Sequence, residues 1–462
     1  MRLSFVRAFF AISLAACGSA LSFSRLLAED RDKAAAEFKF SEVDRQFLDE
    51  ANAVDAKYLK KGLVLQDPDL QTYLDSVGQR VLGNRPIPEN VQFKFRALRD
   101  PMVQAFALPN GSVYVTTGLL ALLENEAELA GVLGHETAHV FERHGYLENR
   151  SVRKKALTLN ILQIVASAAP VGPNLSQAVQ LYGAAVQLGA EVAGDILVAS
   201  IFGYSREMEH QADSDGLAAM IGASYDPSAM ARSFDLLDED SRLEFEPFQG
   251  FYRDHPKLMD RRTFALDFAS THKPEKPIIG NEKDYLAKVA PAICADIESD
   301  LNSRRERTAV ARATRLISVF PENPRYRVLL ADSYRSLGAK SKVPSEDERS
   351  RHGQAEHRKE FYSMTPQEEQ KTLQAKPEGS AALQENRNSA EILYKNVLNS
   401  DPTYSQAHRG LGFLYEDEGK YSDAAAEYRA YLDMVAGTSL DHLRIEHRLA
   451  AAQKMAGLSV TH

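Results

Sequence analysis

The stretch His135-Glu136-Thr137-Ala138-His139 lies at the end of a segment whose pattern predicts a helix. On a helix, His135 and His139 project from the same face, because residues four apart are neighbours one turn away. That spacing lets both imidazoles bind a single tetrahedral zinc ion, which is catalytic when a third protein ligand and a water complete its coordination. Zinc lowers the pKa of such a water toward ~7, and Glu136 is placed to take the proton as the water attacks a carbonyl. The stretch therefore predicts a catalytic zinc site.

The third zinc ligand has to come from a more distant segment. A third histidine of the metzincin type would stand at position 145, where the chain has Gly145 and where the helix should stop. His144 is one position off, and we expect it to face away or to cap the helix end. Glu209 is the better candidate, because Glu209 and Asp213 lie four residues apart on a predicted helix. One carboxylate can bind zinc while the other orients a ligand imidazole. Without the histidine motif, such a pair is typical of a solvated helix face.

The segments before the motif predict a mixed α+β domain. Residues 41–82 have a helical pattern, and residues 91–98 alternate as in a strand. Two further extended runs, 103–108 and 112–115, flank Pro109-Asn110-Gly111, and Asn-Gly is a strong hairpin signal because both residues tolerate positive φ.

Capping residues predict where three helices begin. Thr117 is expected to cap a short helix. Asn125, with the acidic Glu128 three residues later, should open the helix of the histidine motif. Ser205 is expected to cap the helix that carries Glu209 and to let it run to about Gly222.

Composition bounds the class of protein. The chain has 462 residues, of which 44% are hydrophobic and 26% charged, as in a globular protein of two or three domains. Its net charge is −9 with no long basic run, which argues against nucleic acid as a partner. Residues 156–203 are apolar with polar interruptions and predict buried or amphipathic helices, or alternatively a lid over the site. With only two cysteines a disulfide framework is excluded, and Cys294 is expected to be a small buried residue in a helix.

The first residues resemble a targeting segment. Arg2 and Arg7 precede a short apolar stretch that ends in Leu14-Ala15-Ala16-Cys17-Gly18, and that stretch is shorter than a membrane span. The ending resembles a bacterial lipoprotein box, so residues 1–17 are expected to be a signal peptide with lipidation at Cys17, followed by a tether over 18–40. The alternative is an ordinary cleaved signal peptide, which would leave the protein soluble in the periplasm.

A helical repeat begins near residue 285. Ala390, Tyr394 and Leu398 recur 34 residues later as Ala424, Tyr428 and Leu432. This period is typical of tetratricopeptide repeats. Residues 285–458 are therefore expected to form an all-α stack of about four helical pairs, interrupted by a polar insertion at about 339–380.

Two groups of residues carry a family resemblance. The stretch from Ala105 through Leu120 and on to Glu136, together with Tyr204-Ser205-Arg206 leading into Glu209, resembles the HtpX/BepA/Oma-type zinc metallopeptidases. These are gluzincin-like enzymes. The resemblance covers about residues 40–270 and implies a peptidase domain over 41–275. A peptidase domain followed by repeats is most similar to the BepA-like periplasmic proteases.

The resemblance implies roles for further residues. The strand Ser112-Val113-Tyr114-Val115 would be the edge on which an extended substrate pairs, or simply part of the sheet. His255 could occupy the open zinc position in a latent state or stabilise the oxyanion, or be a turn residue. Arg206 and Arg261 could stabilise the oxyanion or, as we expect, clamp carboxylates such as Asp213.

Together these features predict a metalloendopeptidase of the bacterial cell envelope with one zinc ion per chain. The expected substrates are misfolded or stalled outer-membrane proteins, and the repeats would bind these clients or the assembly machinery. The expected location is the outer membrane, on its periplasmic side. The alternative is an assembly factor or chaperone with latent protease activity.

Overall fold

The structure is a computed structural model that describes residues 38–151, 204–240, 258–339, 380–435, 437 and 439–458. Several predicted features lie outside these residues: the signal peptide with Cys17, nearly all of the tether, the whole of segment 156–203, His255 and most of the 339–380 insertion.

The sheet has three strands, β1 (Lys94–Leu98), β2 (Ala105–Ala107) and β3 (Ser112–Thr116), in the order β1-β3-β2. β3 is parallel to β1 and antiparallel to β2, so β2 and β3 form the predicted hairpin. Of the two turn residues only Gly111 has a positive φ, of 92°. A Cβ there would come within 2.8 Å of the backbone of Gln92, so the tight approach to the segment before β1 requires glycine.

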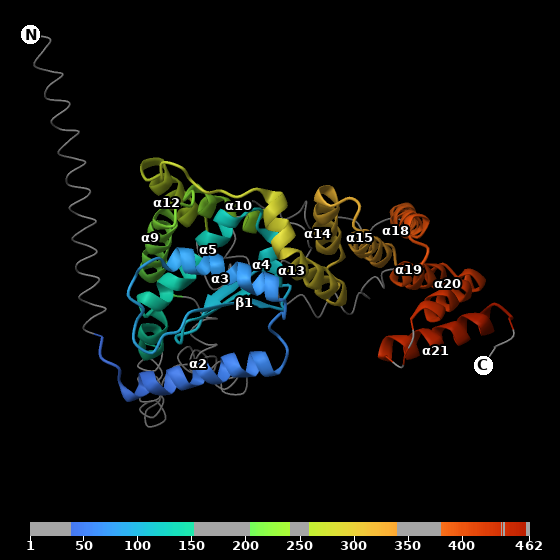
Figure 1. The fold of residues 1–462 in the computed structure, drawn as a ribbon, viewed down its shortest axis with the longest axis horizontal. Coiled ribbons are helices and arrows are strands. Elements are labelled where there is room, and N and C mark those ends of the chain that lie inside the picture. The colour runs from blue at the N-terminus through green and yellow to red at the C-terminus, as the bar shows by residue number, and fades with distance from the viewer. Residues whose placement is uncertain are drawn as a thin grey trace, which may run out of the picture.

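Helices cover both faces of this sheet (Figure 1). Val113 and Val115 belong to the large hydrophobic core shared with α3 (Pro68–Leu82) and α5 (Glu126–Phe141). Tyr114 points the opposite way, into a smaller core with Phe47 of α2 (Glu42–Lys60). The alternation along β3 therefore buries both of its faces.

The predicted helix boundaries hold with three shifts. The helical pattern over residues 41–82 is divided between α2 and α3 by an extended break that includes the Val64 bridge to β1. The short helix α4 (Thr117–Leu122) is capped by Thr116 rather than Thr117. The motif helix α5 ends at Phe141, four residues before Gly145, while Asn125 and Ser205 are N-caps as predicted.

The described residues of this part of the chain also include α9 (Arg206–Gly222), α10 (Ser228–Asp240) and α12 (Leu258–Thr271). α9 packs along α5, and α10 lies between α5 and α12.

The regular elements of the C-terminal part are all helices in the residues that the structure describes. It contains α13 (Glu282–Asn302), α14 (Glu306–Val319), α15 (Pro324–Gly338), α18 (Ser380–Ser400), α19 (Ser405–Asp417), α20 (Tyr421–Met434) and α21 (Leu440–Met455). From α13 on, each of these helices packs on the next, so they form a row that leads away from the sheet (Figure 1). The large core continues through α13 and α14 into α15, whereas a second core is shared by α15 and α18 to α21. Cys294 is buried in α13, as predicted.

None of the helices in the described ranges is long and apolar enough to cross a membrane. The described residues are mostly helical, with one small sheet in the N-terminal part.

Two buried carboxyl groups stand where α13 joins α14. Asp300 receives a hydrogen bond from Arg305 at 3.0 Å, and Asp296 lies 3.7 Å from Arg312, which also pairs with Asp240. Burial raises the pKa of Asp296 to about 7, although the two arginines lower it. Burial and then the charge of Asp296 raise the pKa of Asp300 to about 8. The folded protein therefore retains a proton here at neutral pH.

This pair predicts a loss of stability as pH rises. Because the folded-state pKa values of this pair are raised, the pair binds protons more tightly in the folded than in the unfolded chain between about pH 4 and about pH 8, and its contribution to stability falls across that window. Thermal unfolding of the full chain at several pH values should show that Asp300→Asn loses less stability than the wild type as pH rises, since asparagine keeps the volume and cannot ionise. Equal pH slopes for the wild type and Asp300→Asn would contradict this account.

Candidate metal centre

The helix α5 carries the histidine motif through the middle of the core. The Asn125 side chain accepts a hydrogen bond from the Glu128 amide at 3.1 Å, which fixes where the helix begins. His135, Glu136 and His139 follow on its buried face, and each is at most 2% exposed. The ring nitrogens of two buried histidines need hydrogen-bond partners or a metal ion, since burying polar atoms without partners is costly.

Two glycines let α9 approach α5 closely. A Cβ on Gly216 of α9 would lie 2.9 Å from the backbone nitrogen of His135, and a Cβ on Gly134 would lie 3.0 Å from the carbonyl oxygen of Gly216. Any larger residue at either position would push the helices apart. The crossing brings Glu209, on α9, against both histidines.

His135, His139 and Glu209 form a compact ligand set. Their candidate donor atoms all lie within 4.8 Å of one another, and all three residues are buried. The Glu209 carboxylate lies 3.6 Å from His135 Nε2 and 3.7 Å from His139 Nε2, and the two Nε2 atoms are 3.0 Å apart. Two imidazole nitrogens and one carboxylate oxygen are the ligands of a catalytic metal site with an open fourth position. The residues present therefore fit a metal ion.

Asp213 and Arg261 hold the other side of His135. The Asp213 carboxylate lies 2.9 Å from His135 Nδ1, and Arg261 of α12 donates to both Asp213 oxygens at 2.7 and 2.8 Å. Arg261 also lies 3.1 Å from Glu209. Burial alone would raise the pKa of Asp213, but the Arg261 charge and the His135 hydrogen bond hold it well below its usual range. Asp213 is thus a permanent anion that orients His135.

The second histidine has different neighbours. His139 Nδ1 lies 2.9 Å from Nδ1 of His144, which is 1% exposed. The Tyr204 ring stacks on His139, with the ring centres 4.0 Å apart. Burial lowers the pKa of His144 to about 4, so its imidazole is neutral at neutral pH.

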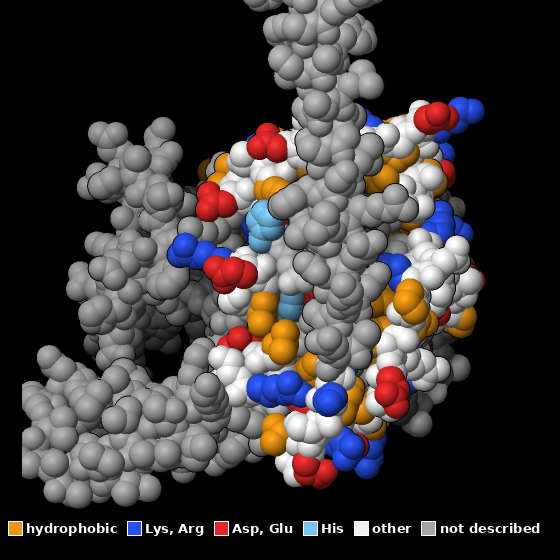
Figure 2. Space-filling model, turned by 90° about the vertical axis from the view of Figure 1, so that its left-hand side faces the viewer, with side chains coloured by type: hydrophobic (Ala, Val, Ile, Leu, Met, Phe, Trp, Pro, Cys, Tyr) orange, Lys and Arg blue, Asp and Glu red, His pale blue; other side chains and the backbone are white. Residues whose placement is uncertain are grey.

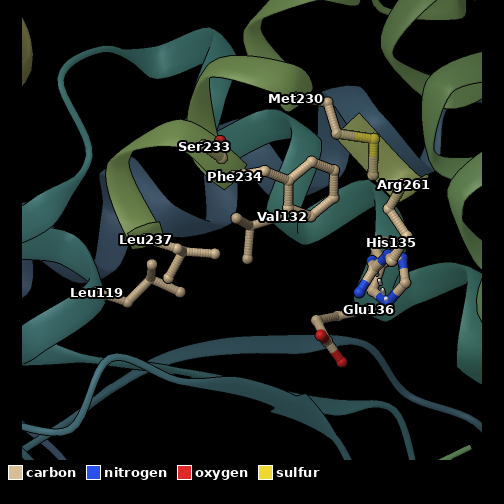
Figure 3. Close-up of a pocket in the computed structure, with 9 residues that line it drawn as sticks. All are labelled: Leu119, Val132, His135, Glu136, Met230, Ser233, Phe234, Leu237 and Arg261. Atoms are coloured by element: carbon tan, nitrogen blue, oxygen red, sulfur yellow. Dashed lines mark hydrogen bonds between the residues drawn. The ribbon is translucent and has the colours of Figure 1, made fainter. Parts of the chain in front are cut away.

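An apolar pocket adjoins the candidate ligands (Figure 3). The side chains of Leu119, Val132, Phe234 and Leu237 line it, and His135, Glu136 and Arg261 stand at one end. Met230 and Ser233 of α10 complete the lining. The lining beside the candidate ligands is therefore mostly apolar.

The structure brings together most of the predicted site residues. His135, Glu136, His139, Glu209, Asp213 and Arg261 meet in one buried cluster. Arg206 does not take part: it is exposed on the first turn of α9, and Arg261 is the clamp of Asp213. The prediction that His144 faces away or caps the helix end is wrong, because its Nδ1 lies 2.9 Å from Nδ1 of His139 and Glu142 is the C-cap. In the sequence, His144 stands one position before 145, where metzincins have their third zinc ligand, and this position was a signal that His144 lies near the candidate ligands.

The predicted substrate edge is wrong. Ser112, Val113, Tyr114 and Val115 form the central strand β3, which has neighbours on both sides and is fully buried. The hairpin signal predicted the pairing of β2 with β3 but said nothing about β1, which adds on the other side of β3. The outer side of β1 pairs in part with the segment near Val64. β2 is therefore the outer strand at the other edge, and it packs against α5.

The surface on the side of α9 and α12 carries no extended basic patch in its described part (Figure 2). Acidic, basic and hydrophobic side chains are interspersed there, in line with the net charge of −9.

Comparison with known proteins finds similarity to metallopeptidases over the part of the chain that holds the site. The model of "Peptidase family M48" matches residues 68–267, which include all the residues of the metal cluster. The chain is 31% identical over 216 residues to a Vibrio cholerae protein described as a candidate beta-barrel assembly-enhancing protease, covering 46% of this chain and 42% of that protein. It is 29% identical over 215 residues to the mitochondrial metalloendopeptidase OMA1 of Schizosaccharomyces pombe. That match covers 46% of this chain and 52% of that protein.

A third relative is the beta-barrel assembly-enhancing protease of Yersinia pestis, 28% identical over 226 residues, covering 48% of this chain and 43% of that protein. The match thus spans about half the length of these relatives. The predicted resemblance to a family of metallopeptidases is confirmed for this part of the chain.

Proposed function

We propose that this chain is a zinc-dependent endopeptidase, because the model of peptidase family M48 matches residues 68–267. The observation that carries the proposal is the buried set His135, His139 and Glu209, whose donor atoms lie within 4.8 Å of one another. Zinc bound there would supply Lewis-acid activation of a water and of the peptide carbonyl. Two nitrogen ligands and one oxygen ligand are typical of catalytic zinc.

Each surrounding residue then has a part in peptide hydrolysis. Glu136, next to the ligand His135, takes a proton from the attacking water and returns it to the leaving amine. Asp213 holds His135 in one tautomer, and Arg261 balances the charge of Asp213 and Glu209. His255 remains a candidate for oxyanion stabilisation or for closing the site in a latent state.

The edge strand β2 is the place where an extended substrate could pair. Ala105 and Ala107 alternate with Gln104, Phe106 and Leu108, and Gln104 and Leu108 bond to β3 through their backbones. In an antiparallel pair, the backbone groups of the intervening residues point away from the partner strand. Ala105 and Ala107 therefore offer their amides and carbonyls on the outer side, next to α5, where β-strand addition would place a peptide near Glu136.

The pocket favours cleavage next to an apolar side chain. Leu237→Val should widen it and shift cleavage toward larger apolar residues by about tenfold, since one methylene in such a pocket changes selectivity by 10–200-fold. Leu236→Val is the matched control, because Leu236 is buried on the same helix and does not line the pocket. Mass spectrometry of casein fragments measures the preference. The same shift in both variants would contradict a role for the pocket.

The all-helical part is proposed to be a set of tetratricopeptide repeats over residues 285–458 that binds client proteins. In support, α13 packs on α14, α15 on α18 and α19 on α20, with α21 last in the row. Gly412 of α19 meets the Tyr428 ring so closely that a Cβ would lie 2.4 Å away, which is the small-on-large packing of such repeats. α15 packs directly on α18, so the 339–380 insertion leaves the row continuous.

The cellular role is proposed from the named relatives. The Yersinia pestis relative is described as a beta-barrel assembly-enhancing protease and the Vibrio cholerae relative as a candidate one. By analogy, this chain would degrade misfolded or stalled outer-membrane proteins on the periplasmic side of the envelope, held there by a lipid on Cys17. The second candidate is an assembly factor or chaperone whose protease site is latent, which the repeat domain favours.

The proposed function is tested by metal removal. The purified full chain should contain about one zinc per molecule and cleave unfolded casein. A chelator should stop cleavage, because three ligands hold the ion with an open position, and added zinc should restore it. Elemental analysis measures the zinc content, and gel assays measure the cleavage of casein. A chain with all three ligands intact that takes up no zinc would overturn the proposal.

A further inference from the structure

His144 reaches the metal centre through the turn that ends α5. Glu142 caps the helix, and Arg143 adopts a positive φ of 58°, which reverses the chain and returns the next side chain toward the helix. The Arg143 guanidinium stacks over the Phe38 ring, 4.3 Å from its centre, so the unusual backbone conformation is packed against the N-terminal segment. His144 is thereby buried beside His139.

A series of hydrogen bonds leads from His144 through Gln211 to Glu142. His144 Nε2 lies 3.3 Å from Gln211 Oε1, and Gln211 Nε2 donates to Glu142 Oε2 at 2.5 Å. Gln211 is on α9, two residues from the ligand Glu209, and Glu142 is the C-cap of α5. The series therefore links the two helices that supply the candidate ligands.

Only one set of proton positions satisfies this series when His139 binds a metal. The Nε2 atom of His139 faces Glu209 and His135, so Nε2 is the coordinating atom and the proton sits on Nδ1. His139 Nδ1–H must then donate to His144 Nδ1, and the proton of His144 must be on Nε2. Gln211 accepts that proton through its oxygen and presents its amide to the Glu142 carboxylate.

We propose that His144, Gln211 and Glu142 form a hydrogen-bond relay that fixes the tautomer and ring orientation of His139 and so tightens metal binding. They are positioning residues, because they act through His139. The relay rests on the proposed function only in that it needs a metal at this centre. The relay to His139 differs from the arrangement at His135, where the Asp213 carboxylate contacts the imidazole directly. A neutral imidazole orients the second ligand without placing another anion beside Glu209.

The test compares zinc affinity in two variants of the full chain. His144→Phe keeps a ring and removes the acceptor, whereas His144→Asn retains an acceptor atom near His139 Nδ1. Partners of metal ligands contribute 10–100-fold in affinity. We therefore expect His144→Phe to weaken zinc binding by about 10–100-fold and His144→Asn to weaken it by about threefold or less. Competition with a chromophoric chelator measures the affinity, and the spectrum of the cobalt-substituted protein reports the ligand geometry. Thermal unfolding of the metal-free chains controls for packing.

The outcomes separate the relay from the peptidase assignment. Equal weakening by both variants would mean that His144 only fills space, and unchanged affinity in both would also overturn the relay. In either case a wild-type chain that binds zinc and cleaves casein would leave the peptidase proposal intact. A wild-type chain that binds no zinc would overturn both. Gln211→Ala, which breaks the relay one bond further out, should weaken binding less than His144→Phe.

Discussion

Glu136→Gln is expected to lower casein cleavage by about 10³-fold while the protein still binds one zinc, since a general base contributes 10²–10⁴ to such a reaction. Glutamine has nearly the same shape and cannot accept the proton of the attacking water. Glu136 does not belong to the ligand set, so the ion should remain bound. Cleavage rate and zinc content are measured on the same preparation.

A matched control is Glu207→Gln, which removes an exposed carboxylate on the first turn of α9. This variant should leave the cleavage rate and the zinc content unchanged. If Glu136→Gln cleaved at the wild-type rate, the assignment of Glu136 as the base would be wrong. If the variant lost its zinc as well, Glu136 would have a structural role instead.

The same variant distinguishes the two proposed cellular roles. A deletion strain that regains outer-membrane assembly when it expresses Glu136→Gln would show that client binding by the repeats dominates. A strain that is not rescued would show that proteolysis is needed.

Arg261→Ala is expected to have the largest effect on stability. Arg261 is 7% exposed, bonds to both oxygens of Asp213 and lies 3.1 Å from Glu209. Its removal leaves two buried carboxylates without their balancing charge, which costs about 3–5 kcal/mol. The cavity left over the Phe234 ring adds to the loss. Urea unfolding of the metal-free chain measures the change.

Zinc should offset part of this loss, because Glu209 then shares its charge with the ion, whereas Asp213 has no such replacement. The variant should therefore gain more stability from zinc than the wild type does. Arg262→Ala is the matched control, because Arg262 is the next residue and forms a half-exposed pair with Asp235. Exposed pairs contribute little to stability. Similar losses in the two variants would contradict the proposed clamp.

Local signals explain which parts of the fold were predictable. Asn125 and Ser205 are N-caps as expected, because the hydrogen bond of a cap is made within one turn of its own helix. The β2–β3 hairpin was predictable for the same reason, since its turn lies between the two strands. The position of β1 beside β3 was not, because a parallel pairing joins segments with no local turn between them. That is why β3 was mistaken for an edge.

The sequence by itself determined the chemistry of the ligands: the spacing of His135 and His139 on a helix places both imidazoles on one face, whatever surrounds them. It also indicated Glu209 and Asp213 by the same periodicity. Only the tertiary structure decided which partner each ligand has. The contact of Gly134 with Gly216 sets how close α9 comes, Arg261 arrives from a third helix, and the turn at Arg143 brings His144 back to His139. These contacts join residues from separate elements, and helix periodicity says nothing about how separate elements cross.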